Sequence, residues 1–251
     1  MKYGIIAAGE GSRLAAEGVV APKPLVKIGG EALIDRLIKV FLDNDAESVA
    51  VICNERMTDV AAHLERIARN GLGWRTVPLH CIVKSTPSSM HSFYEISRYL
   101  GEGPFCVTTV DTIFRADEFA GYICAFASAV KRGDCEGMMG VTDFVDDEKP
   151  LYVETDNSLN ITGFIDSSDT CRYISGGIYG LTPFALETLE ACLGRGESRM
   201  RNFQRALVAD GARLKAYPFS KVLDVDHAGD ITKAEEFICG RWMKDGKEKK
   251  L

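Results

Sequence analysis

The first stretch that could do chemistry is AAGEGSRL, residues 7–14, which directly follows a short apolar run predicted to form a buried strand. Gly9 and Gly11 permit positive φ and let backbone N–H groups approach a phosphate closely. Arg13 adds a planar cation that suits phosphate oxygens. The stretch therefore indicates either a phosphate-binding loop or a tight turn that carries a solvated arginine.

Two familiar glycine-rich loops do not fit this stretch. A dinucleotide-binding fingerprint needs a third glycine where Leu14 stands and an acidic residue that ends a second strand, whereas Asp35 falls within a helical pattern. A Walker loop, G-x-x-x-x-G-K-[ST], is absent. Any phosphate-binding loop here must be of another type.

A rigidly mounted lysine follows in the segment Pro22-Lys23-Pro24-Leu25. The two prolines fix the backbone around Lys23 and reduce the entropy lost in holding its ammonium in one place. This favours a binding role beside the glycine loop, although a plain surface charge remains the alternative.

Two acidic positions could hold a metal ion. Asp111 ends the apolar run FCVTTV, and Asp224-Val225-Asp226 lies on the last predicted strand. Side chains alternate along a strand, so Asp224 and Asp226 are expected on one face with Val225 opposed. Carboxylates at a strand end suit Mg²⁺, which also bridges substrate phosphates. Capping of a turn or of the last helix is the simpler role for each.

Strand-like and helix-like segments alternate along the chain and must position these residues. This alternation favours a mostly parallel sheet with helices on both faces. We interpret residues 1–251 as one domain, with 143–182 as an inserted acceptor-binding subregion. The predicted strands cover 3–8, 48–53, 77–83, 105–110, 137–141, 151–154, 161–165, 173–181, 214–219 and 222–226. The predicted helices cover 31–44, 58–69, 90–100, 117–131, 183–193, 199–209 and 229–242, before a frayed tail.

Composition limits the possible classes of function. The chain has 251 residues, is 46% hydrophobic and 26% charged, and carries a net charge of −6, which excludes the broad positive field of a nucleic-acid-binding protein and argues against adhesion to an anionic membrane. No apolar run approaches the roughly 18 residues that span a bilayer, and the amino terminus lacks a signal-peptide pattern. The eight cysteines show no C-x-x-C spacing, so we expect reduced thiols and a cytoplasmic location.

Taken in order, these motifs resemble the sugar-phosphate nucleotidyltransferases, whose pattern reads approximately A-A-G-x-G-x-R-[LM]…P-K-P-L. The resemblance runs almost the full length and includes GGEALIDRLIKVF, FCVTTVDTIF, SGGIYGLTPFAL and LDVDHAGDITKAEEF. It implies a three-layer α/β/α, Rossmann-like (glycosyltransferase-A-like) fold. It also implies that Arg13 binds the departing pyrophosphate and that Lys23 binds the α-phosphate. Asp111 and Asp226 would bind a Mg²⁺ ion, and Asp224 is the alternative to Asp226 as the second metal ligand. The nucleotide-binding positions by the same resemblance are Ala7, Ala8, Gly9, Gly11, Ser12, Arg13, Thr86 and Ser89.

Two departures from the family pattern bear on the substrates. The loop STPSSMHS, residues 85–92, looks closer to phosphocholine-type cytidylyltransferases than to the sugar-phosphate members. Many sugar-1-phosphate members carry an E-K-P lysine that binds the sugar phosphate, whereas GFIDSS, residues 163–168, offers no lysine. The candidates for binding the acceptor are Gly177, Arg172 and Lys221, with Lys149 as a further cation, and each of the three cations could instead be merely solvated. We interpret Arg199, Arg201 and Arg205 as an exposed helix face.

The resemblance implies transfer of a nucleoside monophosphate (NMP) from an NTP to a small phosphomonoester, with release of pyrophosphate and formation of an NDP-sugar or NDP-alcohol. The monoester is largely a dianion at pH 7, because its second pKa is about 6, so no nucleophile–base pair is required. Alternatives are a CTP-dependent cytidylyltransferase for phosphocholine or inositol phosphate, a non-catalytic nucleotide-binding module and, less plausibly, a nicotinamide-dependent dehydrogenase. The base, the acceptor and the oligomeric state stay open.

Overall fold

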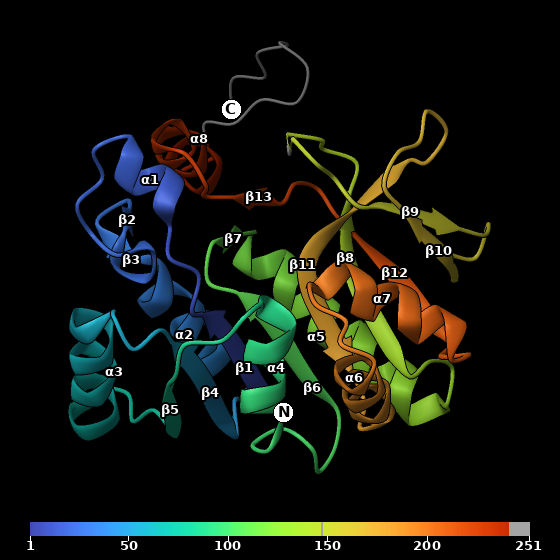
Figure 1. The fold of residues 1–251 in the computed structure, drawn as a ribbon, viewed down its shortest axis with the longest axis horizontal. Helices are drawn as coiled ribbons and strands as arrows, with labels where there is room; N and C mark the ends of the chain where they lie inside the picture. Colours follow the sequence, from blue (N-terminus) through green and yellow to red (C-terminus); the bar gives the residue numbers. More distant parts are fainter. Residues whose placement is uncertain (147, 241–251) are drawn as a thin grey trace.

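The computed structural model describes residues 1–146 and 148–240. A nine-stranded mixed sheet forms its centre, and the strands that carry the amino-terminal motifs are parallel. β1 (Lys2–Ala7) lies between β4 (Ser48–Cys53) and β6 (Phe105–Thr109), and β5 (Leu79–Val83) adds to the far side of β4. The carboxyl ends of these strands meet at one edge, where the glycine loop and Asp111 follow them (Figure 1).

The other half of the sheet turns antiparallel at β11 (Tyr173–Leu181), which pairs with both β6 and β8 (Gly137–Thr142). β12 (Leu214–Phe219) runs parallel to β8. The hairpin of β9 (Tyr152–Thr155) and β10 (Ile161–Ile165) joins the amino-terminal end of β11. This mixed arrangement agrees with the predicted mostly parallel sheet.

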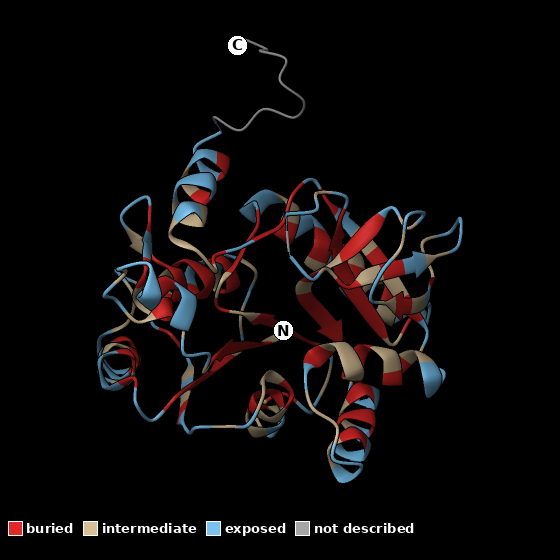
Figure 2. Ribbon diagram, turned by 45° about the horizontal axis from the view of Figure 1, so that its top comes forward, coloured by how far each residue is buried: buried red, intermediate tan, exposed pale blue. Residues whose placement is uncertain are grey.

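Helices cover both faces of the sheet, so the fold has the predicted three α/β/α layers. One hydrophobic cluster contains Tyr3 and Ile5, and the other contains Ile6, because side chains alternate faces along β1. The burial colours in Figure 2 follow the same division, with buried faces of the helices turned toward the sheet. One layer contains α2 (Leu33–Asp43), α3 (Thr58–Asn70), α5 (Ala116–Arg132) and α8 (Ala228–Ile238); the other contains α4 (Ser89–Ser97), α6 (Phe184–Gly194) and α7 (Met200–Ala209).

Short elements at the carboxyl edge position the site. α1 (Ser12–Ala16) and the 3₁₀ turn η1 (Lys23–Leu25) follow β1, and β2 (Lys27–Ile28) pairs with β3 (Glu31–Ala32). β7 (Thr112–Ile113) pairs antiparallel with β13 (Leu223–Asp224). This last pairing brings the late acidic segment beside Asp111.

Several predicted boundaries are wrong. The strand predicted over 222–226 shrinks to Leu223–Asp224, because its partner β7 is only two residues long. The helix predicted from residue 31 starts at Leu33, since Glu31–Ala32 pair with β2. The last helix ends at Ile238, whereas the predicted helix extends to residue 242. Residues 241 and 242 of that prediction, and the tail after them, lie outside the described residues. Within the described ranges, no helix is long and apolar enough to cross a membrane.

Candidate active site

The glycine loop connects β1 to α1 at the carboxyl edge of the sheet. Gly11 adopts φ +63°, and a Cβ atom added there would lie 3.0 Å from the Cβ of Lys23. A side chain at this position would therefore combine an unfavourable backbone conformation with a clash. Glycine at position 11 lets Lys23 pack directly under the loop, while Arg13 extends from the first turn of α1.

Lys23 joins two acidic residues that are far apart in the sequence. Its side chain is only 8% exposed, and its Nζ donates hydrogen bonds to Asp226 Oδ1 at 2.6 Å and to Asp111 Oδ2. Burial alone would lower the pKa of Lys23, but the charge of Asp111 and the hydrogen bonds to both aspartates raise it above its ordinary value. The lysine is thus a fixed cation at neutral pH.

Arg13 completes this cluster from the opposite side of Asp226. Its Nη1 lies 2.9 Å from Asp226 Oδ2, so the two oxygens of one carboxylate bind two different cations. Burial raises the pKa of Asp226, but the hydrogen bond from Lys23 and the charges of Lys23 and Arg13 lower it overall. The structure therefore brings together Arg13, Lys23, Asp111 and Asp226, the four residues that the sequence singled out.

The backbone around β13 explains how Asp226 reaches this position. The Val225 N–H donates to the Asp111 carbonyl at 3.1 Å, and the Val225 side chain is fully buried. Asp224 and Asp226 therefore share the open side, as the alternation predicts. Asp224 accepts a hydrogen bond from Thr112 at 3.2 Å, away from Lys23.

The carboxylates of Asp111 and Asp226 converge on one cation, the Lys23 ammonium. Oxygen atoms that share one cation in this way fit the donor set of a hard divalent ion that also binds water and phosphate oxygens. Among the described residues, no group of three or more His, Cys, Asp or Glu side chains is arranged to hold a metal. Any ion here would thus take few protein ligands.

A cleft of about 520 Å³ extends from this cluster along the glycine loop. It is lined by most of the positions predicted to bind nucleotide; Ala7 is instead buried behind the loop. Several small polar residues that also line it were not named individually from the sequence. Two of them lie in the loop 85–92, which the sequence analysis singled out as a whole, and nothing in the local pattern of Asn54 and Thr109 distinguishes them from ordinary strand ends. The predicted residues in the lining are Ala8, Gly9, Gly11, Ser12, Arg13, Lys23, Thr86, Ser89, Asp111 and Asp226, and the missed ones are Asn54, Ser88, Ser92 and Thr109.

Comparison with known proteins identifies the relatives of this arrangement. A family model described as nucleotidyl transferase matches residues 3–241. The chain belongs to the nucleotidyl transferase family. The family resemblance predicted from the sequence is therefore confirmed.

The relatives of this nucleotidyl transferase are distant in sequence but similar in fold. The Rubrobacter xylanophilus protein named Bifunctional IPC transferase and DIPP synthase is 25% identical over 256 residues, which cover 97% of this chain and 53% of the relative. The chain spans about half the length of the curated relatives it matches. A Bacillus anthracis structure described as a candidate glucose-1-phosphate thymidylyltransferase has a TM-score of 0.80 at 20% identity and covers 98% of both chains. The inositol-1-phosphate CTP transferase of T. maritima has a TM-score of 0.70 at 18% identity, covering 94% of this chain and 97% of the other.

The loop at the far end of the cleft is held by hydroxyl groups. The hydroxyls of Thr86 and Ser92 lie 2.6 Å apart, and Ser88 Oγ lies 2.9 Å from His91 Nδ1. Ser85 Oγ donates to Asn54 Oδ1 at 3.1 Å, which ties the loop to the end of β4. This end of the cleft of the nucleotidyl transferase is therefore polar and short of charge.

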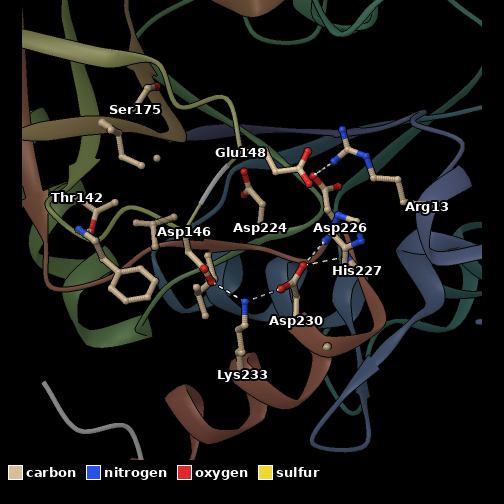
Figure 3. A pocket seen from close by; sticks show the side chains of 16 residues that line it. Arg13, Thr142, Asp146, Glu148, Ser175, Asp224, Asp226, His227, Asp230 and Lys233 are labelled. Atoms are coloured by element: carbon tan, nitrogen blue, oxygen red, sulfur yellow. Dashed lines mark hydrogen bonds and ion pairs between the residues drawn. The ribbon is translucent and has the colours of Figure 1, made fainter. Parts of the chain in front are cut away.

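A second cavity, of about 310 Å³, adjoins the cluster and shares Arg13 and Asp226 with the first cleft (Figure 3). The end of β8 and the loop after it form one wall through Thr142, Phe144 and Glu148. Part of its lining falls within residues 143–182, the subregion predicted to bind the acceptor, but the cavity itself was not predicted, because its walls come from segments that are remote along the chain. Its other walls contain Ile174, Ser175 and Gly176 of β11, residues 222–224 and 226–227, and the start of α8.

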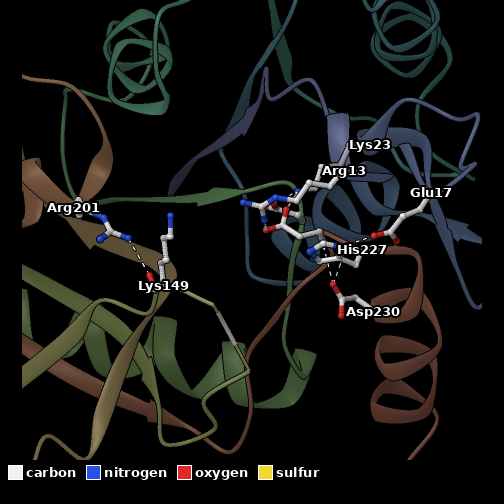
Figure 4. A network of polar contacts seen from close by, with 9 residues as sticks. Arg13, Glu17, Lys23, Lys149, Arg201, His227 and Asp230 are labelled. Carbon is white, nitrogen blue, oxygen red and sulfur yellow. Dashed lines mark hydrogen bonds and ion pairs between the residues drawn. The ribbon is translucent and has the colours of Figure 1, made fainter. Parts of the chain in front are cut away.

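His227 and Glu17 fasten α8 to α1 beside the cluster (Figure 4). His227 Nδ1 lies 2.6 Å from Glu17 Oε1, and the Ala228 N–H donates to Glu17 Oε2 at 2.6 Å. The hydrogen bond with Glu17 raises the pKa of His227. Asp230 accepts from the backbone N–H groups of Asp226 and His227. These contacts fix the backbone on which Asp226 stands.

The three predicted acceptor-binding positions lie in different surroundings. Lys221 is only 3% exposed, with its ammonium 4.1 Å from the centre of the Phe144 ring, so its alternative interpretation as a solvated cation is wrong. Arg172 is 71% exposed, stacks on Tyr173 and lies 3.7 Å from Asp143. Gly177, at φ +68°, forms the irregular step in β11 beneath Thr112. None of the three lines either of the two cavities.

The prediction of an exposed arginine face holds for Arg199, which is exposed and directly precedes α7, but it is wrong for Arg201 and Arg205. Arg201 and Arg205 are about one-third exposed, and both bind Asp166 Oδ1 at 2.7 Å. Arg201 also donates to the Lys149 carbonyl at 3.0 Å, and Arg205 to the Phe164 carbonyl at 3.1 Å. They fasten α7 to β10 and to the loop that precedes β9.

Proposed function

We propose that this protein transfers NMP from an NTP to a phosphomonoester and releases pyrophosphate, giving an NDP-sugar or a related NDP-alcohol. The observation that carries the proposal is the cluster in which Lys23 and Arg13 bind Asp226, with Asp111 on the same ammonium. Two cations and two carboxylates at the mouth of a glycine-lined cleft suit a triphosphate and a divalent ion.

The main barrier to this reaction is electrostatic. Two unit charges about 4 Å apart repel each other by about 4 kcal/mol at an effective dielectric constant of about 20, and the attacking monoester is itself a dianion. Arg13 and Lys23 offset this repulsion from one side, and loop N–H groups around Gly9 and Gly11 would bind the triphosphate. Mg²⁺ held by Asp111 and Asp226 would supply further neutralisation of phosphate charge.

Pyrophosphate release is the direct test of the proposed function. Each of the common NTPs is incubated with Mg²⁺ and with glucose 1-phosphate, phosphocholine or inositol 1-phosphate. We expect release that depends on both substrates and stops when EDTA removes the metal. Tight NTP binding without release from any pair would instead favour a non-catalytic nucleotide-binding module.

A second candidate is a CTP-dependent cytidylyltransferase for a small alcohol phosphate. It is supported by the hydroxyl-rich end of the cleft at Thr86, Ser88 and Ser92, which differs from the usual sugar-phosphate pattern. The similarity to proteins named for inositol-1-phosphate CTP transfer and for IPC transfer points in the same direction. Preference for CTP together with phosphocholine or inositol 1-phosphate would decide for this candidate.

A further inference from the structure

The short segment of residues 111–114 carries one acidic residue of the cluster and helps to position the other. Asp111 opens it, and the β7 strand that follows pairs with β13. The Asp111 carbonyl also accepts a hydrogen bond from the Val225 N–H at 3.1 Å, one residue before Asp226. A shift of this segment would therefore move the Asp111 carboxylate directly and the Asp226 carboxylate through β13.

The other end of this segment is held by Arg36, one turn into α2. Arg36 Nη2 donates a hydrogen bond to the Phe114 carbonyl, and the guanidinium carbon lies 5.5 Å from the centre of the Phe114 ring. Arg36 is only 8% exposed and Phe114 is fully buried, so this contact is shielded from solvent. The segment is thus held by β13 along β7 and by α2 where β7 ends.

The same helix holds the segment that carries Lys23. The Leu33 N–H at the start of α2 donates to the Val26 carbonyl at 2.9 Å, and the Val26 N–H donates to the Lys23 carbonyl at 3.1 Å. Leu33 and Arg36 lie about one helical turn apart, so their two hydrogen bonds start from one rigid unit. The start of α2 therefore sets the distance between Lys23 and the Asp111 segment, whose side chains meet in the cluster.

An arginine is an unfavourable choice for a purely structural contact at this position. Burial lowers the pKa of Arg36 to about 10, and the charge of Glu31 opposes this only in part. The Nη1 atom of Arg36 is buried and has no hydrogen-bond partner among the described residues. A buried charge with an unpartnered N–H group costs free energy that an apolar side chain of similar length would not. Stability alone therefore does not account for Arg36.

We infer that Arg36 is a positioning residue, which holds residues 111–114 so that the Asp111 carboxylate stays beside Lys23 and Asp226. The inference rests on the proposed function and adds a residue remote from the substrates, because Arg36 lines neither of the two cavities. Arg36 would act through Asp111, the proposed ion ligand, and not through the glycine loop. Turnover and the requirement for a divalent ion should therefore depend on Arg36, whereas affinity for the NTP should change little.

Steady-state kinetics of Arg36→Met test this role. A small displacement of Asp111 should lower kcat about ten- to hundredfold and raise the Mg²⁺ concentration that gives the half-maximal rate, while the KM of the NTP stays within about twofold. The Tm should stay within about 3 °C of the wild-type value, because removal of the buried charge offsets the loss of one hydrogen bond. Arg36→Lys keeps an N–H donor and should recover part of kcat. The matched control is Lys39→Met on the same helix, which removes a half-exposed cation that binds Glu31 and should leave every constant unchanged.

Hydrogen exchange followed by mass spectrometry gives a readout that does not depend on turnover. Arg36→Met should speed exchange in peptides that contain residues 111–114 and Val225, because the Val225 N–H bonds to the Asp111 carbonyl. Exchange elsewhere in the sheet should match the wild type. Lys39→Met should exchange like the wild type throughout.

Three outcomes decide the inference. Wild-type kcat in Arg36→Met, or unchanged exchange around Asp111, would overturn the positioning role while the proposed function survives. A joint loss of kcat, NTP affinity and Tm would show that Arg36 only stabilises the fold, and would overturn the role as well. If the wild type releases no pyrophosphate with any pair of NTP and acceptor, the proposed function and the positioning role fall together.

Discussion

Two regions contribute to the second cavity but are held in different ways. The nucleotide wall is residues 7–25 with Asp111 and Asp226, and the acceptor wall is residues 142–146 and 148–150. In the nucleotide wall, charged side chains bind one another, and Lys23 is almost fully buried between two carboxylates. In the acceptor wall, Arg201 donates to the main-chain carbonyl of Lys149 at 3.0 Å, and Lys233 binds Asp146 at 2.8 Å. The first wall is thus held by charged side chains that share one another as partners, whereas the second is held by side chains that reach it from two separate helices.

The largest expected effect comes from Asp111→Ala in the nucleotide wall. Removal of this carboxylate takes away a proposed ion ligand and one partner of Lys23, so we expect pyrophosphate release to fall by at least about a thousandfold. The fold should survive, because Lys23 still binds Asp226 in this variant. The Asp111 side chain also does not belong to the hydrophobic core. Pyrophosphate release and circular dichroism measure the two effects, and Asp59→Ala, at an exposed position in the first turn of α3, is the control. Metal-independent turnover in Asp111→Ala would contradict the proposed role.

The next effect is expected from Lys23→Met, which leaves two carboxylates facing each other without their shared cation. We expect turnover to fall by about a hundred- to a thousandfold, the range found when a single stabilising donor is removed. The free protein should also bind Mn²⁺ more tightly than wild type, because the ammonium no longer competes for the two carboxylates. Titration of Mn²⁺ followed by electron paramagnetic resonance, without nucleotide, measures this gain. Equal Mn²⁺ affinity in both proteins would show that Lys23 and the ion do not share a position.

The contrast between the walls also explains what the sequence could predict. The nucleotide wall follows from local patterns: an apolar run that ends in glycines, a lysine between prolines, and an aspartate at a strand end. Its assembly depends on one non-local step, the pairing of β13 with β7, and the alternation of Asp224, Val225 and Asp226 anticipated that geometry.

For the acceptor wall, the sequence predicted only a broad acceptor-binding subregion over residues 143–182 and none of the contacts that hold it. Its position depends on Arg201 and Lys233, which reach it from helices more than 50 residues away along the chain. Lys221 was misjudged for a similar reason, since only the folded chain places Phe144 and Phe237 around it. Side-chain type alone could not separate these cations, because each of them is compatible with solvent or with a phosphate.

A smaller effect is expected from Gly11→Ala, which tests how closely the nucleotide wall is packed. Alanine would have to adopt φ +63° with its Cβ 3.0 Å from Lys23, so we expect a loss of about 1–2 kcal/mol in unfolding free energy. Gly9→Ala is the matched control, because φ there is not positive and nothing lies within 4 Å of an added Cβ. Calorimetric melting of both variants should show a lower Tm for Gly11→Ala alone. Equal Tm values would mean that the loop adapts and that the wall is less rigid than its contacts indicate.

The smallest effect is expected from Lys221→Met beside the acceptor wall. Burial lowers the pKa of Lys221, so between that lowered value and the ordinary lysine pKa the unfolded chain binds more protons than the folded one. Wild-type stability relative to Lys221→Met should therefore rise as the pH increases toward the ordinary lysine pKa of about 10.4. Denaturant unfolding of both proteins across this range measures the difference in their unfolding free energies. The contributions of titratable groups that both proteins share cancel in this difference. The acceptor KM should stay unchanged, because the ammonium packs on the Phe144 and Phe237 rings rather than lining the site. A rise of about tenfold or more in the acceptor KM would instead place a phosphate-binding cation at Lys221.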